Sequence, residues 1–125
     1  MIIFENRAST ILYNLLCSNK SNGIYILPAN ICPIVPLVFE KAKQPYEFCD
    51  ISLTSLCLDE NLILNKITNR IYSGILFVRT YGTTDDFDHF LKKIKLLSPQ
   101  ITIIDDQCPN IPEFLPKSTS ADIIL

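Results

Sequence analysis

Two adjacent acids, Asp105 and Asp106, follow an apolar run at residues 100–104, and they are the residues in this sequence best placed to do chemistry. The apolar run predicts a buried strand. Successive side chains of a strand point to opposite faces of the sheet. The two carboxylates therefore cannot both enter the core, and we expect one of them to face a ligand crevice beyond the end of the strand.

Two other interpretations of this acidic pair remain open from the residues alone. The carboxylates could simply enter a loop or cap nearby backbone N–H groups. They could also hold Mg²⁺ for phosphotransfer, because paired acids at a strand end suit a hard cation. The sequence has no P-loop pattern for that reaction, and its three glycines, Gly23, Gly74 and Gly82, form no G-x-G-x-x-G for a dinucleotide.

The other reactive side chains give weaker signals. The cysteines are odd in number, form no C-x-x-C pair and have only one histidine, His89, to help them bind zinc. We therefore predict no metal site. We interpret the cysteines as reduced, buried thiols: Cys17, Cys32, Cys49, Cys57 and Cys108. His89 lies in a charged stretch and is interpreted as a solvated surface residue. Arg79, at a predicted strand end, could bind an anion or form a structural ion pair.

Alternating helix-like and strand-like segments should position these residues. Apolar residues recur at helical spacing in four segments, and Thr84 or Asp85 can cap the last of them: 8–17, 34–42, 59–68 and 86–97. Short apolar runs predict five strands: 24–27, 45–51, 74–78, 100–104 and 121–125. This alternation is typical of βαβ units. It predicts one α/β domain over residues 1–125, a three-layer sandwich around a mostly parallel sheet.

In an open parallel sheet, ligands bind beyond the carboxyl ends of the strands. That rule selects four places in the chain: 28–33, Asp50, 79–83 and 105–110.

Composition narrows the function classes. The chain has 125 residues, of which 48% are hydrophobic and 19% charged, with a net charge of −2. This is enough apolar material for a core. The net negative charge argues against nonspecific electrostatic binding to nucleic acid or to an acidic membrane. No apolar run approaches the ~18–20 residues that span a bilayer, and the start does not resemble a signal peptide. We expect a cytoplasmic protein.

Four blocks, in order along nearly the whole chain, resemble the first part of the DegT-type sugar aminotransferases, a branch of the fold-type I pyridoxal-phosphate enzymes. Residues 6–16 resemble the family's G-R-x-A-L-Y helix start, and Leu27–Pro33 (LPANICP) resembles its V-P-A-Y-T-C-P loop. Lys43–Ile51 is similar to G-A-K-P-V-F-V-D-I. Residues 78–87 and 103–106 are similar to V-H-L-Y-G-x-P-x-D and V-I-E-D.

The resemblance implies pyridoxal phosphate as cofactor and assigns roles to particular residues. Asp106 matches the carboxylate that pairs with the pyridine nitrogen and keeps it protonated, so that the ring can accept electrons. Arg7, Ala8 and Ser9 match the helix start that receives the cofactor phosphate. Cys32 matches the residue that covers one face of the ring.

The departures from the family pattern limit what the chain should do alone. Asn6 replaces the usual glycine of the phosphate turn, Cys32 stacks less well than an aromatic ring, and Gln107–Cys108 replaces a small pair. None of the lysines matches the family's Schiff-base lysine: Lys20, Lys41, Lys43, Lys66, Lys92, Lys93, Lys95 and Lys117. We therefore expect no catalytic residue here, no covalent cofactor and no activity of this chain alone.

The alternative is a non-enzymatic α/β module that serves binding or interaction. The apolar end of the chain, Ile123–Leu125, predicts an exposed sheet edge that favours self-association. We expect a homo-oligomer, or pairing with a complementary aminotransferase fragment.

Overall fold

The computed structural model describes residues 3, 5–80, 83, 85–109 and 120–125, and within them the chain forms a five-stranded sheet. The strands pair in the order β2-β1-β3-β4-β5, and each of these pairings is parallel. Their bounds are β1 (Tyr25–Pro28), β2 (Tyr46–Cys49), β3 (Gly74–Val78), β4 (Thr102–Asp106) and β5 (Ile123–Ile124). The predicted parallel sheet is confirmed.

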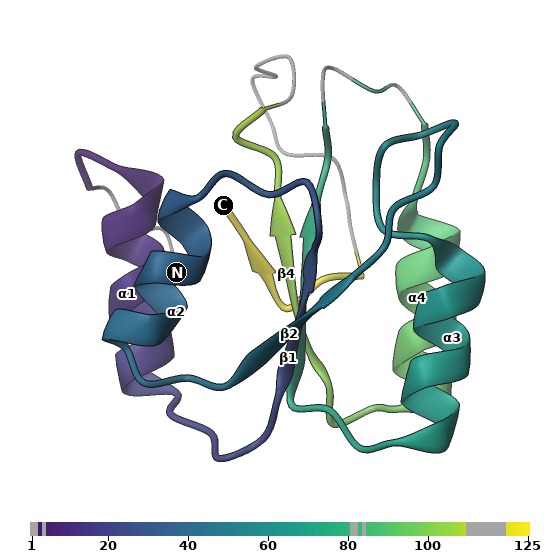
Figure 1. Ribbon diagram of the computed structural model, residues 1–125, viewed down its shortest axis with the longest axis horizontal. Helices are drawn as coiled ribbons and strands as arrows, with labels where there is room; N and C mark the ends of the chain where they lie inside the picture. Colours follow the sequence, from purple (N-terminus) through teal and green to yellow (C-terminus); the bar gives the residue numbers. More distant parts are fainter. Residues whose placement is uncertain (1–2, 4, 81–82, 84, 110–119) are drawn as a thin grey trace.

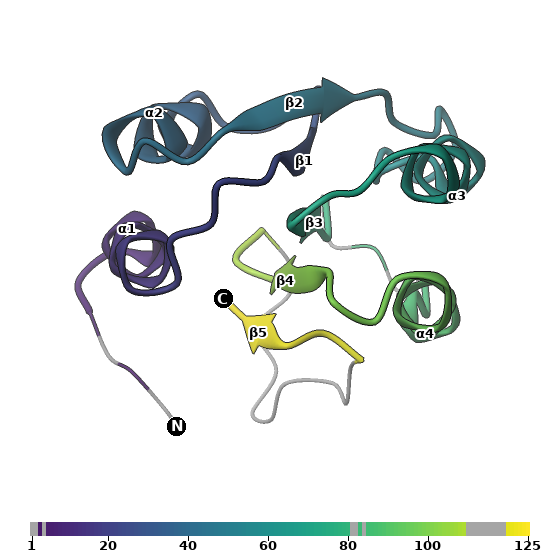
Figure 2. The same cartoon turned by 90° about the horizontal axis from the view of Figure 1, so that it is seen from below.

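The helices cover both faces of this sheet. They are α1 (Ala8–Ser18), α2 (Ile34–Lys41), α3 (Glu60–Asn69) and α4 (Asp88–Leu97). Figures 1 and 2 show α1 and α2 on one face and α3 and α4 on the other, which confirms the predicted three layers. No helix in the described ranges is long and apolar enough to cross a membrane.

Strand alternation divides the apolar side chains between two cores. On β3, Phe77 packs toward α3 and α4, whereas Leu76 and Val78 pack toward α1 and α2. On β4, Ile103 and Ile104 divide in the same way. All five residues of β3 are buried because both neighbouring strands and both helical layers enclose it. This arrangement explains the continuous apolar runs in the sequence.

Gly74 permits the close pairing of β1 with β3. A Cβ atom at this position would lie 2.0 Å from the Tyr25 ring, so a larger residue would push the two strands apart.

Helix α4 begins two residues later than predicted. Its N-cap is Phe87, and the Asp86 carboxylate accepts the Asp88 N–H at 2.9 Å. Thr84 lies outside the described residues, and Asp85 is not the cap. The physical reason is the burial of Phe87, whose ring packs 4.9 Å from that of Phe77 and fixes the entry of the chain.

Helix α3, by contrast, has a side-chain cap, since Asp59 accepts the Leu62 N–H at 2.9 Å.

Candidate functional site

A cavity of about 270 Å³ lies at the carboxyl ends of β1, β3 and β4. Its walls come from three of the four places that the strand-end rule selects, and from α2 and the end of β3. The lining residues are Asn30, Ile31, Cys32, Val35, Val78, Thr80, Asp106 and Pro109. The fourth place, Asp50, is exposed and does not line this cavity. The topology therefore brings residues that are far apart in the sequence into one mostly apolar pocket.

Asp106, the last residue of β4, supplies the carboxylate of this pocket. The Cys108 N–H donates to its Oδ1 at 3.0 Å, and the Arg79 N–H donates to its backbone oxygen at 2.9 Å. Burial raises the pKa of the Asp106 carboxyl; hydrogen bonding from Cys108 opposes this, and the charge of Asp105 adds to it. Burial thus disfavours the ionised form of Asp106, and a positively charged group of a ligand would stabilise that form.

Asn30 lies in the wall of the cavity, and its side chain is held by the neighbouring loop. Its Nδ2 donates to the Leu56 carbonyl at 2.9 Å and holds the loop at Leu56, whose φ is 58°. Its Oδ1 is buried and has no hydrogen-bond partner in the described part of the chain. A buried acceptor without a donor costs free energy, and the hydrogen bond from Nδ2 to Leu56 holds the amide in this position. The sequence gives no signal for Asn30 beyond its place in a loop that the strand-end rule selects.

The two groups of predicted site residues lie in different places. Cys32 is exposed and lines the cavity with Asp106. Arg7 is the N-cap of α1, and Ala8 and Ser9 are its first two residues. Ser9 lines a separate groove between α1 and α2 together with Tyr13 and Leu37. Among the described residues no side chain caps α1, which leaves its first N–H groups open to an anion. Figure 1 shows α1 beginning at the same end of the molecule as the carboxyl end of β4.

Asp105 has a different environment from its neighbour. It is fully buried and accepts hydrogen bonds from Arg79 Nε at 3.0 and 3.1 Å and from Arg79 Nη2 at 2.9 Å. The Arg79 guanidinium also lies 5.9 Å from the Phe87 ring, on the α3 and α4 side of the sheet. Asp105 and Asp106 thus face opposite layers and do not converge on one cation, which argues against the magnesium interpretation.

The cysteine prediction needs correction. Cys49 and Cys57 are buried, but Cys17, Cys32 and Cys108 are exposed, because one lies on the outer side of α1 and two lie in loops after strands. All five are free thiols. His89 is exposed on α4, as predicted.

No lysine lines the cavity among the described residues, and Lys117 lies outside them.

Comparison with solved structures identifies the fold. NtdA from Bacillus subtilis, solved with bound PMP, is 26% identical with a TM-score of 0.72, and the match covers 93% of this chain and 26% of that chain. The E. coli GDP-4-keto-6-deoxy-D-mannose-3-dehydratase with bound hydrated PLP is 21% identical, with a TM-score of 0.69 and coverage of 89% and 29%. The sugar aminotransferase CalS13 from Micromonospora echinospora is 12% identical, with a TM-score of 0.62 and coverage of 80% and 28%.

One of these structures is a sugar aminotransferase and the other two hold PMP or PLP, and their match to this chain confirms the fold expected from the sequence resemblance. The chain spans about a quarter to a third of the length of the structures that it matches. Comparisons with models of protein families and with curated proteins give no match.

Proposed function

We propose that this chain is the cofactor-holding first part of the large domain of a pyridoxal-phosphate-dependent sugar aminotransferase. The observation that carries the proposal is that Asp106 and Cys32, the residues assigned to the cofactor ring, line one cavity at the carboxyl end of a parallel sheet. They come from segments more than seventy residues apart, so their meeting depends on the fold and not on local sequence.

The cavity suits an aromatic ring that carries a protonated nitrogen. Ile31, Val35 and Val78 provide apolar walls that exclude water, and Asp106 provides the acceptor that holds a proton on the ring nitrogen. When bound, the cofactor supplies a ring that accepts electrons from a substrate carbanion. The protein's part in this chemistry is to fix the charge, and Cys32 covers the ring face.

The start of α1 is the phosphate-holding part of the proposal. Arg7, Ala8 and Ser9 contribute uncapped backbone N–H groups and a hydroxyl, and the positive end of the helix dipole favours an anion there. Asn6 stands where the family has glycine, so the backbone at that turn cannot approach the phosphate as closely. The donors of α1 would hold the phosphate without that contact.

We propose that the chain does not complete transamination alone. No lysine lines the pocket among the described residues. In this proposal a lysine from elsewhere forms the covalent bond to the cofactor. The edge strand β5, with Ile124 39% exposed, is where a complementary fragment or a second copy of the chain would extend the sheet. We also propose a cytoplasmic location, because free cysteines stay reduced there.

Titration of the full chain with pyridoxamine phosphate tests the proposal, because this form has no aldehyde and needs no lysine. We expect saturable binding with one site per chain, and weaker binding of pyridoxamine, which lacks the phosphate. Equal binding of the two compounds would show that the start of α1 does not bind the phosphate. Failure to saturate with either compound would refute the cofactor site.

A further inference from the structure

We infer that Arg79 is a positioning residue for the Asp106 carboxylate, acting from the opposite face of the sheet; the inference rests on the proposed function. Arg79 follows β3 and does not line the cavity. The family resemblance assigns it no role, and from the sequence alone it could bind an anion or form a structural ion pair.

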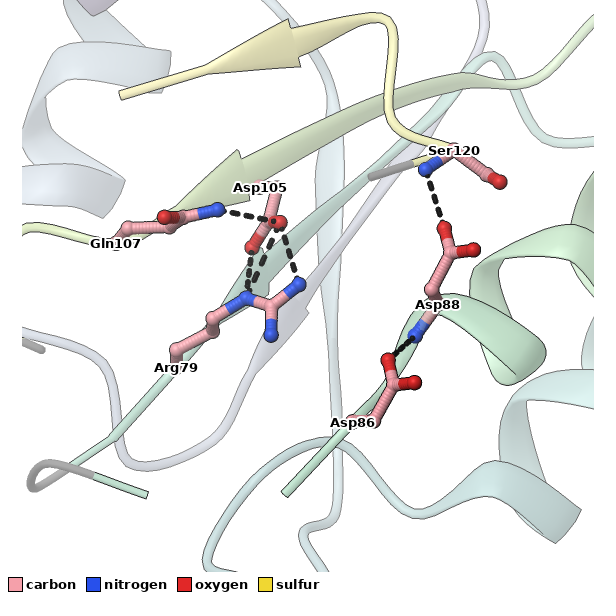
Figure 3. Close-up of polar contacts among 6 residues, drawn as sticks. All are labelled: Arg79, Asp86, Asp88, Asp105, Gln107 and Ser120. Atoms are coloured by element: carbon pink, nitrogen blue, oxygen red, sulfur yellow. Dashed lines mark hydrogen bonds and ion pairs between the residues drawn. The ribbon is translucent and has the colours of Figure 1, made fainter. Parts of the chain in front are cut away.

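The side chain of Arg79 fixes Asp105. Three hydrogen bonds of 2.9–3.1 Å join the guanidinium to both carboxylate oxygens, and the two side chains are only 3% and 0% exposed. Figure 3 shows the guanidinium and the Asp105 carboxylate directed toward each other, with the Gln107 amide reaching the same carboxylate from the left. The planar fork of an arginine allows little rotation in such a pair, which a lysine would not reproduce.

The backbone of Arg79 fixes Asp106 at the same time. Its N–H donates to the Asp106 carbonyl at 2.9 Å, which extends the β3–β4 ladder beyond the pair Val78 and Asp106. One residue therefore holds Asp105 by its side chain and Asp106 by its main chain. Because the intervening peptide is planar and strand side chains alternate, this arrangement directs the Asp106 side chain toward the cavity.

The next two residues complete the arrangement. Gln107 Nε2 donates to Asp105 Oδ2 at 3.0 Å on one face, and the Cys108 N–H donates to Asp106 Oδ1 at 3.0 Å on the other. Asp105 stands next to Asp106, and its charge adds to the raised pKa of the Asp106 carboxyl even though Arg79 pairs with it. The cluster therefore supplies the direction of the Asp106 side chain toward a ring nitrogen.

Two variants test this inference. Arg79→Lys keeps the positive charge but loses the bidentate fork. The double variant Arg79→Met with Asp105→Asn removes both charges, so that neither is left buried and unpaired, and its asparagine oxygen can still accept from Gln107. The matched control is Glu47→Gln with Lys66→Met, which removes an ion pair of 2.6 Å on β2 and α3, away from the cavity.

The measurements are the dissociation constant of pyridoxamine phosphate and the ring-nitrogen chemical shift of isotopically labelled ligand. We expect the double variant to bind about tenfold more weakly, the usual loss for a misdirected hydrogen bond to a charged group, with the nitrogen signal moved toward its unprotonated position. Arg79→Lys should show a smaller change of the same kind, and the control should leave both readouts unchanged.

The outcomes separate this inference from the proposed function. If Arg79→Lys and the folded double variant keep the native affinity and nitrogen signal while Asp106→Asn loses them, the positioning role of Arg79 is refuted and the cofactor site stands. If Asp106→Asn also changes neither readout, the proposed function itself fails. Should the double variant not fold, the Arg79→Lys comparison still decides, because it retains the charge of the buried pair.

Discussion

Asp105 and Asp106 are consecutive residues of β4, yet one carboxylate is buried against Arg79 under α3 and α4 and the other lines a cavity on the side of α1 and α2. Alternation along the strand turns an acidic pair into two groups with separate tasks. The first is a structural ion pair, and the second remains available to a ligand at the end of the sheet.

Replacing Asp106 by asparagine should stabilise the ligand-free protein at neutral pH. The pKa of this carboxyl is raised in the folded state, mainly by burial, so its ionised form costs stability above that pKa. The cost disappears as the pH falls below the unfolded pKa, where the group is protonated in both states. Urea unfolding at several pH values should therefore show a stability gain for Asp106→Asn that shrinks on acidification. The exposed acid Asp85, changed to asparagine, serves as the control, and an equal gain there would contradict this explanation.

An aromatic residue at position 32 should tighten binding of the cofactor ring. Cys32 lines the cavity and is exposed, so a larger side chain has room to extend over a bound ring. Ring stacking contributes about 0.5–1.5 kcal/mol, which corresponds to an affinity gain of about two- to tenfold for Cys32→Tyr. Calorimetric titration with pyridoxamine phosphate measures this gain, with Cys17→Tyr on α1 as the control. An unchanged affinity for Cys32→Tyr would show that this residue does not face the ring.

Removing the cap of α3 should destabilise the fold. The Asp59 carboxylate accepts the Leu62 N–H at 2.9 Å, and loss of such an N-cap costs about 1 kcal/mol. Asp59→Ala should lower the free energy of unfolding by that amount. Asp85→Ala, which removes an acid near α4 that does not cap it, should have little effect. Equal losses in the two variants would show that the structure has the wrong cap for α4.

Glu47 should make the fold sensitive to acid. Its carboxylate accepts from Lys66 Nζ at 2.6 Å and from the Tyr72 hydroxyl at 2.7 Å, and these contacts, with Lys66 the main one, lower its pKa. The stabilisation is present above the unfolded pKa and is lost as the pH falls through the lowered folded pKa. Glu47→Gln should cost about 1 kcal/mol at neutral pH, and its unfolding curve should approach that of the wild type in acid. A loss that does not vary with pH would point to packing instead of charge.

The sequence was sufficient to predict the parallel α/β sheet and the end of it where a cavity forms. Periodicity predicts the elements, and the strand-end rule selects the loops that carry Cys32 and Asp106. The sequence alone could not predict that Asp105 pairs with Arg79. This contact depends on the β3–β4 register, which sets Phe77 beside Asp105. The unpaired oxygen of Asn30 is likewise a consequence of loop packing, and the late start of α4 follows from the burial of Phe87.

The most direct test of the account is a titration of the wild-type chain and of Asp106→Asn with pyridoxamine phosphate, followed by calorimetry. A charge-assisted hydrogen bond to the ring nitrogen contributes about 1.5–3 kcal/mol, so we predict that the variant binds at least about tenfold more weakly. Because the variant should be no less stable than the wild type, the loss cannot come from unfolding. Equal affinities of the two proteins would contradict the claim that this carboxylate anchors the cofactor ring.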